Sequence, residues 1–492
     1  KEIRNVKSNQ SGSVGFSPKK LNVDLGKVSK WRFKSDQIFI ENDEWTSPEI
    51  IITNDPFNKP QLLLINKDVK IKNSKGDLII KSRRSSLVLD QIKIPIGSRR
   101  IKPNNNSLRW GIAYDKSTND GIFVYRNSDI IKFFDENLTL KFNKKFNLQR
   151  ALQGKTKVFS GENQSVFGSK VNQNAKTLDY FGLDVDLNAN FFGFDFISNI
   201  SFNSLDIDKF KKIINAKSEL SKIIYQEESE NSEKETKITF FGNYRDKIWN
   251  GSIGEKEILS AYGIKVEKNK NWLDNKIKKA ARFGFGYGYY ESSAKRSSTE
   301  IINSNRLNIS VERSHSYPIW MPFVNEEITS EYSYISSPIN KGLNFNVQTI
   351  FDFFRYEENH FQNLYTFRAG PDLTLGDFKK NMFDYTRLSV YPKLTIARGE
   401  SPFDFDQSVD NHSIEFNIEQ QLIGPLTFKY STEYNLDINS DNFKNFFNSR
   451  YELDWNRRAY KIGLYYDEKS KSGGLNFKIF SFNFDGIGKR FN

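Results

Sequence analysis

The sequence GESPFDFDQSVDNHSIEFNIEQQLIGPLTFKYSTEYNLDIN, residues 399–439, decides the fold. Apolar and polar residues alternate on both sides of Gly424-Pro425, as in Ile414-Glu415-Phe416 and in Phe428-Lys429-Tyr430. Because successive side chains of a β-strand point to opposite faces, this pattern predicts an antiparallel hairpin with one apolar face and one polar face. Each arm has roughly 9–11 residues, the length that a tilted strand needs to cross a bilayer.

The composition excludes one class of membrane protein and favours another. Only 37% of the residues are hydrophobic, the mean hydropathy is −0.63, and no run approaches the ~18 apolar residues of a spanning helix. Aromatic residues make up 15% of the chain, with 43 Phe and 22 Tyr, and a barrel offers an apolar outer band and two interfacial girdles for them. We predict an all-β protein: a large transmembrane antiparallel β-barrel of about 20–26 strands, preceded by a short β-jellyroll or taco.

The charge and the lack of cysteine exclude several kinds of site. The net charge is +13, but the basic residues are scattered through alternating strands without a recognisable nucleic-acid module. We therefore expect no nucleic-acid partner; attraction to anionic lipid headgroups or an A/T-rich genome explains the charge as well. We also expect no catalytic site, cofactor or metal. His412-Ser413 lies near Asp410, but neighbours on a strand face opposite ways and cannot readily form a nucleophile–base pair.

The first 96 residues divide into a lead-in and a small domain. Residues 1–30 are polar, and we expect them to be poorly ordered. Residues 31–96 contain short strands with two alternating apolar residues each, separated by turn sequences such as Thr53-Asn54-Asp55-Pro56. These apolar residues either line the trough of a jellyroll or form an ordinary sandwich core. They are Ile38, Ile40, Ile50, Ile52, Leu62, Leu64, Val69, Ile71, Leu78, Ile80, Leu87 and Leu89.

Pro95 and Pro103 mark the predicted domain junction, and residues 97–492 form the predicted barrel. Because proline cannot donate to a sheet ladder, the two prolines either weaken pairing at a lateral gate beside the first barrel strand or merely shape the linker. Residues 206–236 interrupt the strand pattern with weak helical periodicity and an acidic run. We interpret them as a long external loop, partly helical and solvated.

The polar face of the hairpin supplies candidate residues for a polar lumen. The loop Ser401-Pro402-Phe403-Asp404-Phe405-Asp406 mixes aromatics with acids, which suits a loop folded inward over the lumen; calcium binding by Asp404, Asp406 and Asp410 is the weaker alternative. In residues 282–289 glycines alternate with aromatics, so either the inner wall is closely approached or the strand curves there. The lumen candidates are Glu415, Asn417, Glu419, Lys429, Glu433 and Asn435.

Three stretches carry a resemblance to a known family. They are Thr53–Phe57 with Pro60, Arg245–Glu255 continuing to Ser260–Gly263, and Gly399–Pro425 followed by Arg457-Arg458. From about Trp31 to the C-terminus, the chain resembles a cyanobacterial outer-membrane family related to LptD, the lipopolysaccharide-assembly protein with an OstA-like jellyroll.

The resemblance implies a transport route. It implies a periplasmic jellyroll that receives lipopolysaccharide from a bridge of similar jellyroll proteins, and a barrel in the cell outer membrane whose first and last strands part sideways. A lumen that wide needs a plug, a lid or a bulky passenger, and a plug lipoprotein is one candidate partner. Proteobacterial LptD relatives carry cysteines that lock the two domains together, and this chain has none. An apolar trough would carry the acyl chains, since each buried methylene is worth ~0.8 kcal/mol.

Three other functions fit the same pattern. A porin-like diffusion channel with a periplasmic tethering domain uses the same alternating strands. A structural protein needs the front domain only as a tether, and a soluble all-β binding protein is the remaining alternative. Arg457-Arg458 either binds lipid phosphate or lies solvated in a hairpin turn.

Overall fold

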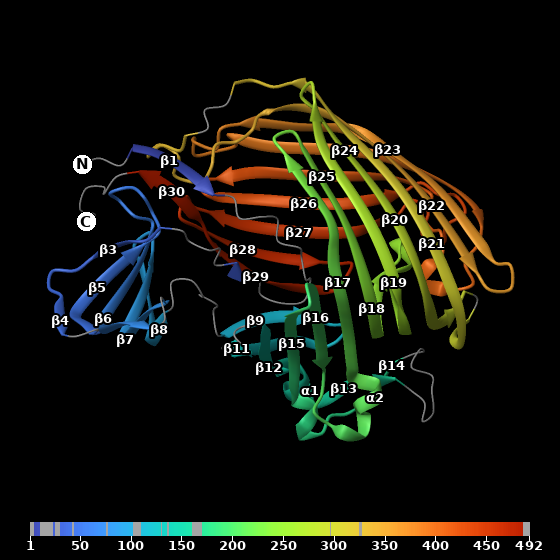
Figure 1. Cartoon of the computed structure of the whole chain (residues 1–492), viewed down its shortest axis with the longest axis horizontal. Coiled ribbons are helices and arrows are strands. Elements are labelled where there is room, and N and C mark those ends of the chain that lie inside the picture. The colour runs from blue at the N-terminus through green and yellow to red at the C-terminus, as the bar shows by residue number, and fades with distance from the viewer. Residues whose placement is uncertain are drawn as a thin grey trace.

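The molecule consists of a β-barrel and a smaller sheet beside one end of it (Figure 1). The computed structural model describes residues 4–9, 23–24, 30–41, 44–74, 77–101, 110–128, 130–134, 137–159, 170–295, 297–323 and 327–485. No helix within these ranges is long and apolar enough to cross a bilayer.

The barrel is a closed antiparallel ring of 18 strands within the described residues, which confirms the predicted fold class. The ring has fewer strands than the predicted 20–26 because the strands from β17 to β24 have 15–24 residues each, longer than the ~10 assumed. The short strand β11 (Ile131–Phe133) continues the line of β10 along β12. The ring strands are β9 (Trp110–Asp115), β10 (Gly121–Asn127), β12 (Leu138–Phe146), β15 (Phe181–Phe191), β16 (Phe194–Phe202), β17 (Ile214–Ser229), β18 (Ser232–Trp249), β19 (Glu255–Asp274), β20 (Ile277–Ala294), β21 (Ser297–Trp320), β22 (Gly342–Tyr356), β23 (Phe361–Gly376), β24 (Tyr385–Gly399), β25 (His412–Ile423), β26 (Leu426–Asn435), β27 (Phe446–Asn456), β28 (Tyr460–Asp467) and β29 (Ser472–Ile479).

The alternation of side chains fixes which face of the wall is outside. On β20, Phe283, Phe285 and Tyr287 are 43%, 37% and 49% exposed on the outer face, and glycines occupy the inner positions between them. The hairpin that decides the fold consists of β25 and β26, and Gly424 takes a φ of +52° in its turn. On its outer face Tyr430 stacks on Tyr451 of β27, with ring centroids 4.9 Å apart. The rings therefore lie on the wall's outer surface and do not pack against a second sheet.

Residues 206–236 are not an external loop, so that prediction is wrong. Only η2 (Ile207–Lys209) and α2 (Phe210–Ile213) are helical there, and the remainder belongs mostly to the hairpin of β17 and β18. Outward residues such as Leu220 alternate with inward charges such as Glu219, which hides the apolar face in a hydropathy average. The acidic run is the solvated tip of two strands that extend past the apolar band.

The two ends of the barrel differ in their connections. At one end, which we call the front end, most adjacent strands are joined by short turns such as 192–193, 230–231 and 275–276, but β21 and β22 are joined there by the long connection 321–341. The front sheet docks at this end. The other end, the far end, carries long connections such as 147–180 and 400–411. The connection 147–180 includes α1 (Leu148–Gln153), η1 (Thr177–Tyr180) and the hairpin of β13 (Lys155–Phe159) and β14 (Lys170–Asn174); η3 (Gly251–Ile253) and η4 (Asp404–Asp406) lie in other far-end loops.

The front sheet is antiparallel and six-stranded, in the order β3-β5-β6-β7-β8 with β4 also on β5. Its last strand continues to Ile101, so the boundary with the barrel lies after Ile101 and not after residue 96. Its strands are β3 (Arg32–Lys34), β4 (Phe39–Glu41), β5 (Glu44–Thr53), β6 (Leu62–Ser74), β7 (Asp77–Leu89) and β8 (Ile92–Ile101).

The lead-in predicted for residues 1–30 contains two short strands. β1 (Arg4–Asn9) pairs with β30 (Ser481–Asp485), which follows β29, and β2 (Val23–Asp24) runs parallel to β29. Apart from these strands and Lys30, the lead-in lies outside the described residues.

The inner glycines of β20 yield a test of the wall's packing. A Cβ on Gly288 would lie 2.7 Å from the backbone oxygen of Tyr262 and 3.1 Å from the ring of Phe241, so Gly288→Ala should destabilise the barrel by about 1–3 kcal/mol. Gly284→Ala on the same face meets only Ser310 at 3.7 Å and is the matched control. The midpoint of heat-modifiable gel mobility measures both, and equal midpoints would contradict this account.

Candidate functional site

The ring closes between its first and last strands through a short contact, which we call the seam. Within the described residues β29 pairs with β9 at three positions, whereas it pairs with β28 at eight. Towards the front end the later residues of β29 have no partner on β9, and Phe477 and Lys478 pair there with β2. The three seam pairs are Ser472↔Asp115, Gly473↔Tyr114 and Gly474↔Ala113.

Local sequence explains why the seam is short. β9 has six residues, and β29 presents Gly473 and Gly474 at the contact. Glycine weakens a strand interior because it has no side chain to pack and loses more entropy on ordering. On the outer face, the rings of Tyr114 and Tyr466 approach within 6.4 Å over Gly473 and cover the contact from outside.

The prolines predicted for a lateral gate do not form the seam. Pro95 lies in β8 of the front sheet, paired with Ser86, and Pro103 lies outside the described residues. A proline on an edge strand removes no hydrogen bond from the ladder, which fits its place in β8. The weak pairing expected there arises at glycines of the last strand instead.

The residues predicted for the trough divide into a packed group and an exposed group. Five of them, with Leu64 and Trp31, form a buried cluster on one face of the front sheet. Ile38 and Ile40 are 39% and 64% exposed at the free edge. Leu78 is in β7, but its side chain lies outside the described part of the structure. The buried five are Ile50, Ile52, Val69, Ile71 and Ile80.

The apolar face of the front sheet continues onto the barrel wall. Leu62 and Leu89 are buried against Tyr460, Phe477 and Ile479 of β28 and β29, and Leu87 packs beside them. This contact lies on the last two strands of the ring, so the front sheet is attached directly beside the seam.

Two ion pairs and one tyrosine hold this attachment, and we call these five residues the latch. Arg458 donates to both carboxylate oxygens of Asp55 at 3.2 and 2.9 Å, and the two side chains are only 5% and 0% exposed. Arg457 donates to Asp90 at 2.8 and 2.7 Å, and the Tyr460 hydroxyl donates to the same carboxylate at 2.7 Å.

Neutral contacts complete the attachment. Asn54 donates to the backbone oxygens of Ala459 and Phe480 at 2.7 and 2.9 Å, and Gln61 donates to that of Ser333 at 2.9 Å. The turn sequence from Thr53 to Phe57 is therefore an interface as well as a turn.

Arg32 on β3 braces the same turn from the front sheet. It donates to the backbone oxygens of Asp55 and Phe57 at 3.1 and 2.8 Å. Burial lowers the pKa of Arg32, and the nearby Asp55 carboxylate opposes that shift.

Both interpretations of Arg457-Arg458 are wrong. The side chains are neither solvated in a turn nor directed at lipid, because acids of the front sheet bind them. The acids, Asp55 and Asp90, lie in turns, where an aspartate side chain ordinarily accepts hydrogen bonds from nearby backbone N–H groups. The sequence alone therefore does not predict that they bind arginines. The one available signal was that an Asn-Asp turn and an adjacent Arg pair both belonged to the motifs of the resemblance.

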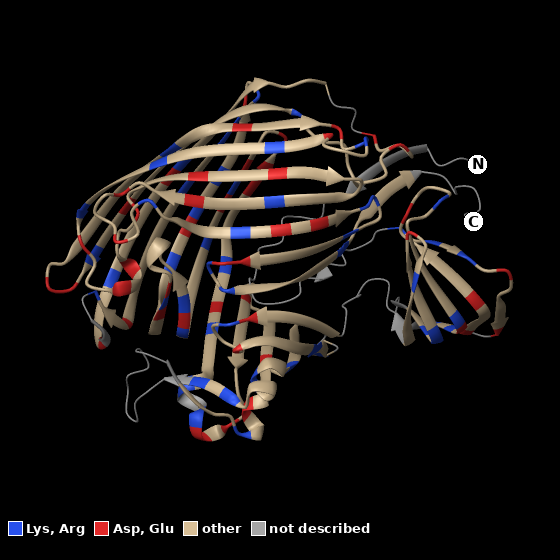
Figure 2. Ribbon diagram, turned by 180° about the vertical axis from the view of Figure 1, so that it is seen from behind, with Lys and Arg blue, Asp and Glu red and all other residues tan. Residues whose placement is uncertain are grey.

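The six residues predicted for the lumen lie on the inner side of β25 and β26 and pair with neighbouring strands. Lys429 binds Glu419 at 2.8 Å and Asp454 at 3.6 Å, and Lys393 binds Glu433 at 3.1 Å. The remaining partners are Arg368 for Glu415, Ser389 for Asn417, and Asp410 for Asn435. Charges of both signs recur along these strands in Figure 2, so the inner wall is polar and largely self-neutralised.

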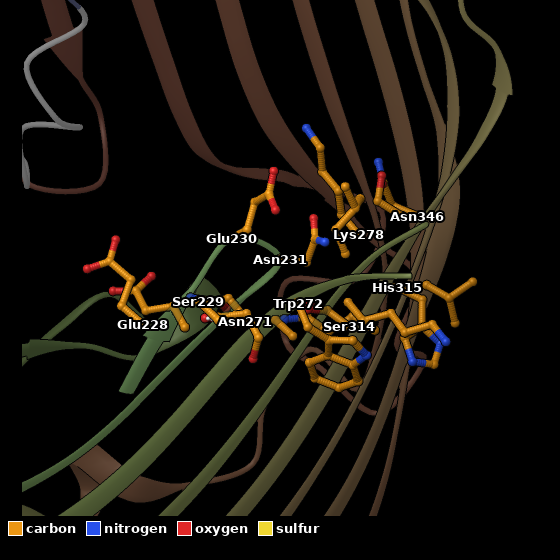
Figure 3. Close-up of a pocket in the computed structure, with 18 of the residues that line it drawn as sticks. Glu228, Ser229, Glu230, Asn231, Asn271, Trp272, Lys278, Ser314, His315 and Asn346 are labelled. Carbon is orange, nitrogen blue, oxygen red and sulfur yellow. Dashed lines mark hydrogen bonds between the residues drawn. The ribbon is translucent and has the colours of Figure 1, made fainter. Parts of the chain in front are cut away.

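A pocket of about 690 Å³ opens along the inner wall (Figure 3). The β17–β18 turn contributes Glu230 and Asn231, and strands β20 to β22 contribute Lys278, Ser314 and Asn346. Carboxylate, ammonium, amide and hydroxyl groups together offer donors and acceptors of the kind that bind a sugar.

A loop folds inward over the far end of the lumen, as the sequence predicted for Ser401–Asp406. Phe403 and Phe405 are 0% and 6% exposed and pack against inward residues of β18, β19 and β22. Arg306 donates to both oxygens of Asp406 at 2.6 and 3.0 Å, and the Tyr356 hydroxyl donates to it at 2.6 Å. We call residues 400–411 the plug loop.

The acids of the plug loop bind protein groups. Asp404 pairs with Lys256 at 2.7 Å, and Asp410 accepts from the Ser252 hydroxyl at 2.6 Å and from Asn435 at 2.5 Å. Among the described residues no group of three His, Asp or Glu could hold a metal. The alternative of calcium binding therefore has no geometry in its favour.

A family model described as "Protein of unknown function (DUF3769)" matches residues 25–483. This chain belongs to the DUF3769 family. The match covers the front sheet, the latch, the seam and the plug loop, so all of these features lie within the region that the family model describes. No curated protein matches this DUF3769 chain. Its closed barrel with an apolar outer face is the architecture of outer-membrane proteins, a fold typical of non-enzymatic transport.

Removing the latch arginine should detach the front sheet. Arg458→Gln leaves Asp55 buried without its counter-charge, at an expected cost of about 3–5 kcal/mol. Trypsin should then cleave between Ile101 and Trp110 faster, and the midpoint of heat-modifiable mobility should fall. Arg84→Gln is the control, since the Arg84–Asp68 pair is exposed and its loss should cost about 0–1 kcal/mol. A latch variant as stable as the control would show that the ion pair does not hold the interface.

Loosening the plug loop should open the lumen to ions. Phe403→Ser with Phe405→Ser removes the apolar contacts that seat the loop, and single-barrel conductance in planar bilayers should rise severalfold. Ile438→Ser, at a 74% exposed position of a neighbouring far-end loop, is the control and should leave conductance unchanged. Unchanged conductance in the double variant would mean that other residues block the lumen.

Proposed function

We propose that this protein is an outer-membrane translocon that inserts lipopolysaccharide into the outer leaflet. The front sheet lies in the periplasm and passes the acyl chains along its apolar face. The chains leave sideways through the seam between the first and last strands, while the sugar headgroup crosses the polar lumen. The observation that carries the proposal is the placement of a three-pair seam directly beside β28 and β29, the strands on which the front sheet's apolar face docks.

The energetics favour such a route for an amphiphile. Several acyl chains cannot pass through water cheaply, since each exposed methylene costs about 0.8 kcal/mol. Leu62, Leu87 and Leu89 lead from the front sheet's cluster to Phe477 on β29 and form an almost continuous apolar surface. Among the described strands, parting the three residue pairs of the seam costs less than parting any other two neighbours of the ring, because backbone hydrogen bonds in hydrocarbon are expensive to lose.

The orientation follows from the loops. Outer-membrane barrels have short periplasmic turns and longer extracellular loops, so the front end, where most turns are short, is the end that we place in the periplasm. The one long connection described there, 321–341, packs against the front sheet. The plug loop then lies at the extracellular end. The resemblance to the LptD-related family supports the same orientation and adds two expected partners: a bridge of periplasmic jellyroll proteins and a plug lipoprotein.

An open diffusion porin is the competing function, and two observations weigh against it. The plug loop packs Phe403 and Phe405 against the inner wall at the far end of the lumen. A porin also has no use for an apolar sheet docked beside a weak seam.

Cross-linking the seam should stop export without unfolding the barrel. The chain has no cysteine, so Ala113→Cys with Gly474→Cys introduces one specific disulfide between β9 and β29. In cells depleted of the wild-type protein, surface lipopolysaccharide should fall to the depleted level under oxidising conditions and recover on reduction. Gly284→Cys with Ser310→Cys ties β20 to β21 in the opposite wall and should leave export intact. Undiminished surface display with a locked seam would refute lateral release.

A further inference from the structure

Two cations stand side by side on the outer face of the wall next to the seam. Arg126 of β10 pairs directly with Lys144 of β12. The neighbouring inward residues Phe123 and Tyr125 are 1% and 3% exposed, whereas Arg126 and Lys144 are exposed. Because side chains alternate along a strand, both cations point away from the lumen.

These cations are flanked by apolar residues towards both ends of the barrel. Ile122 and Val124 precede Arg126 on the outer face of β10 towards the far end. Towards the front end, Ile131 and Phe133 of β11 continue the outer face, paired with β12 at Leu140 and Leu138. The pair therefore lies on the lipid-facing surface near the far end of β12, which ends at Phe146.

The position of these charges is costly unless a ligand neutralises them. Like charges directly opposite on paired strands repel each other, and cations on the lipid face of a barrel destabilise it. In the described part of the chain neither Arg126 nor Lys144 forms an ion pair with an acid. The adjacent Lys145, which points inward, contrasts with them: it binds Asp184 at 2.6 Å and is 5% exposed.

An aromatic ring completes the arrangement on the seam side. The Arg126 guanidinium lies 5.2 Å from the ring centroid of Trp110, its pairing partner on β9. A guanidinium over an indole ring still has N–H groups that can donate to an anionic oxygen. Trp110 is 58% exposed and offers its other surface to an acyl chain.

We propose that Arg126, Lys144 and Trp110 form a binding site for the phosphate of a membrane lipid. The two cations take the phosphate oxygens, Trp110 covers the glycerol or sugar linkage, and the acyl chains extend towards the front end along the outer face, past Ile131 and Phe133. The site goes beyond lipid export, because it needs only that the outer wall contacts lipid. It would hold an anionic lipid two strands from the seam.

The test compares lipids that differ in the phosphate. Native mass spectrometry of the purified full chain in detergent measures binding of phosphatidylglycerol and of a galactosyl diacylglycerol with the same acyl chains. The wild type should retain the phospholipid preferentially. Arg126→Gln with Lys144→Gln should weaken phosphatidylglycerol binding about tenfold or more and leave the galactolipid unaffected.

A matched variant controls for the loss of two charges. Arg313→Gln with Lys268→Gln removes two exposed outward cations from β21 and β19 on the opposite wall and should not change either affinity. Heat-modifiable mobility checks that each variant is folded. Equal loss in the control, no loss in the Arg126/Lys144 variant, or displacement of the lipid by millimolar inorganic phosphate would each overturn the proposal. Because no transport is measured, the result does not depend on whether the seam opens.

Discussion

Every strand that crosses hydrocarbon must satisfy its backbone hydrogen bonds with two neighbours, and this constraint governs the whole structure. A closed ring meets it without an edge. On one side of the ring the backbone pairing is extensive, since β17 to β24 have 15–24 residues each. On the other side it is short, since β9 and β29 share three residue pairs. The weakest point of the ring is thus set by two short terminal strands and two glycines.

The front sheet stabilises the strands next to that weak point without closing it. The buried Asp55–Arg458 pair and the Asp90 carboxylate fix the sheet to the start of β28, and Leu62 packs on Phe477 of β29. None of these contacts reaches β9. The last strand of the ring, β29, is therefore anchored to the front sheet, whereas in the described residues the first strand, β9, pairs with β29 at the three positions of the seam. In the proposed function, β9 separates while β29 stays in place.

The sequence predicted what depends on local alternation and not what depends on partners far along the chain. The β25–β26 hairpin, its turn at Gly424, the inward polar residues and the inward plug loop all follow from period-two patterns and turn chemistry. The latch could not be predicted, because Asp55 and Arg458 are 403 positions apart and each alone reads as a surface turn residue. The sequence does not predict the hairpin at 214–249, because its inward charges and its solvated tip weaken the alternation of apolar and polar residues. The sequence predicts a weak pairing at prolines, because it does not show how few residues the first and last strands share.

The distribution of charge across the wall links these features. Inside, several cations have acidic partners: Lys429 with Glu419, Lys393 with Glu433, Lys145 with Asp184. A largely neutralised lumen attracts neither free anions nor free cations strongly, and the plug loop folds over its far end, so the wall is poorly suited to selective ion passage. Outside, near the seam, Arg126 and Lys144 have no acidic partner among the described residues. If the inner wall conducts headgroups and the outer wall holds lipid phosphate, the two faces of the same short strands serve the two halves of one amphiphile, which is the division that a lateral opening requires.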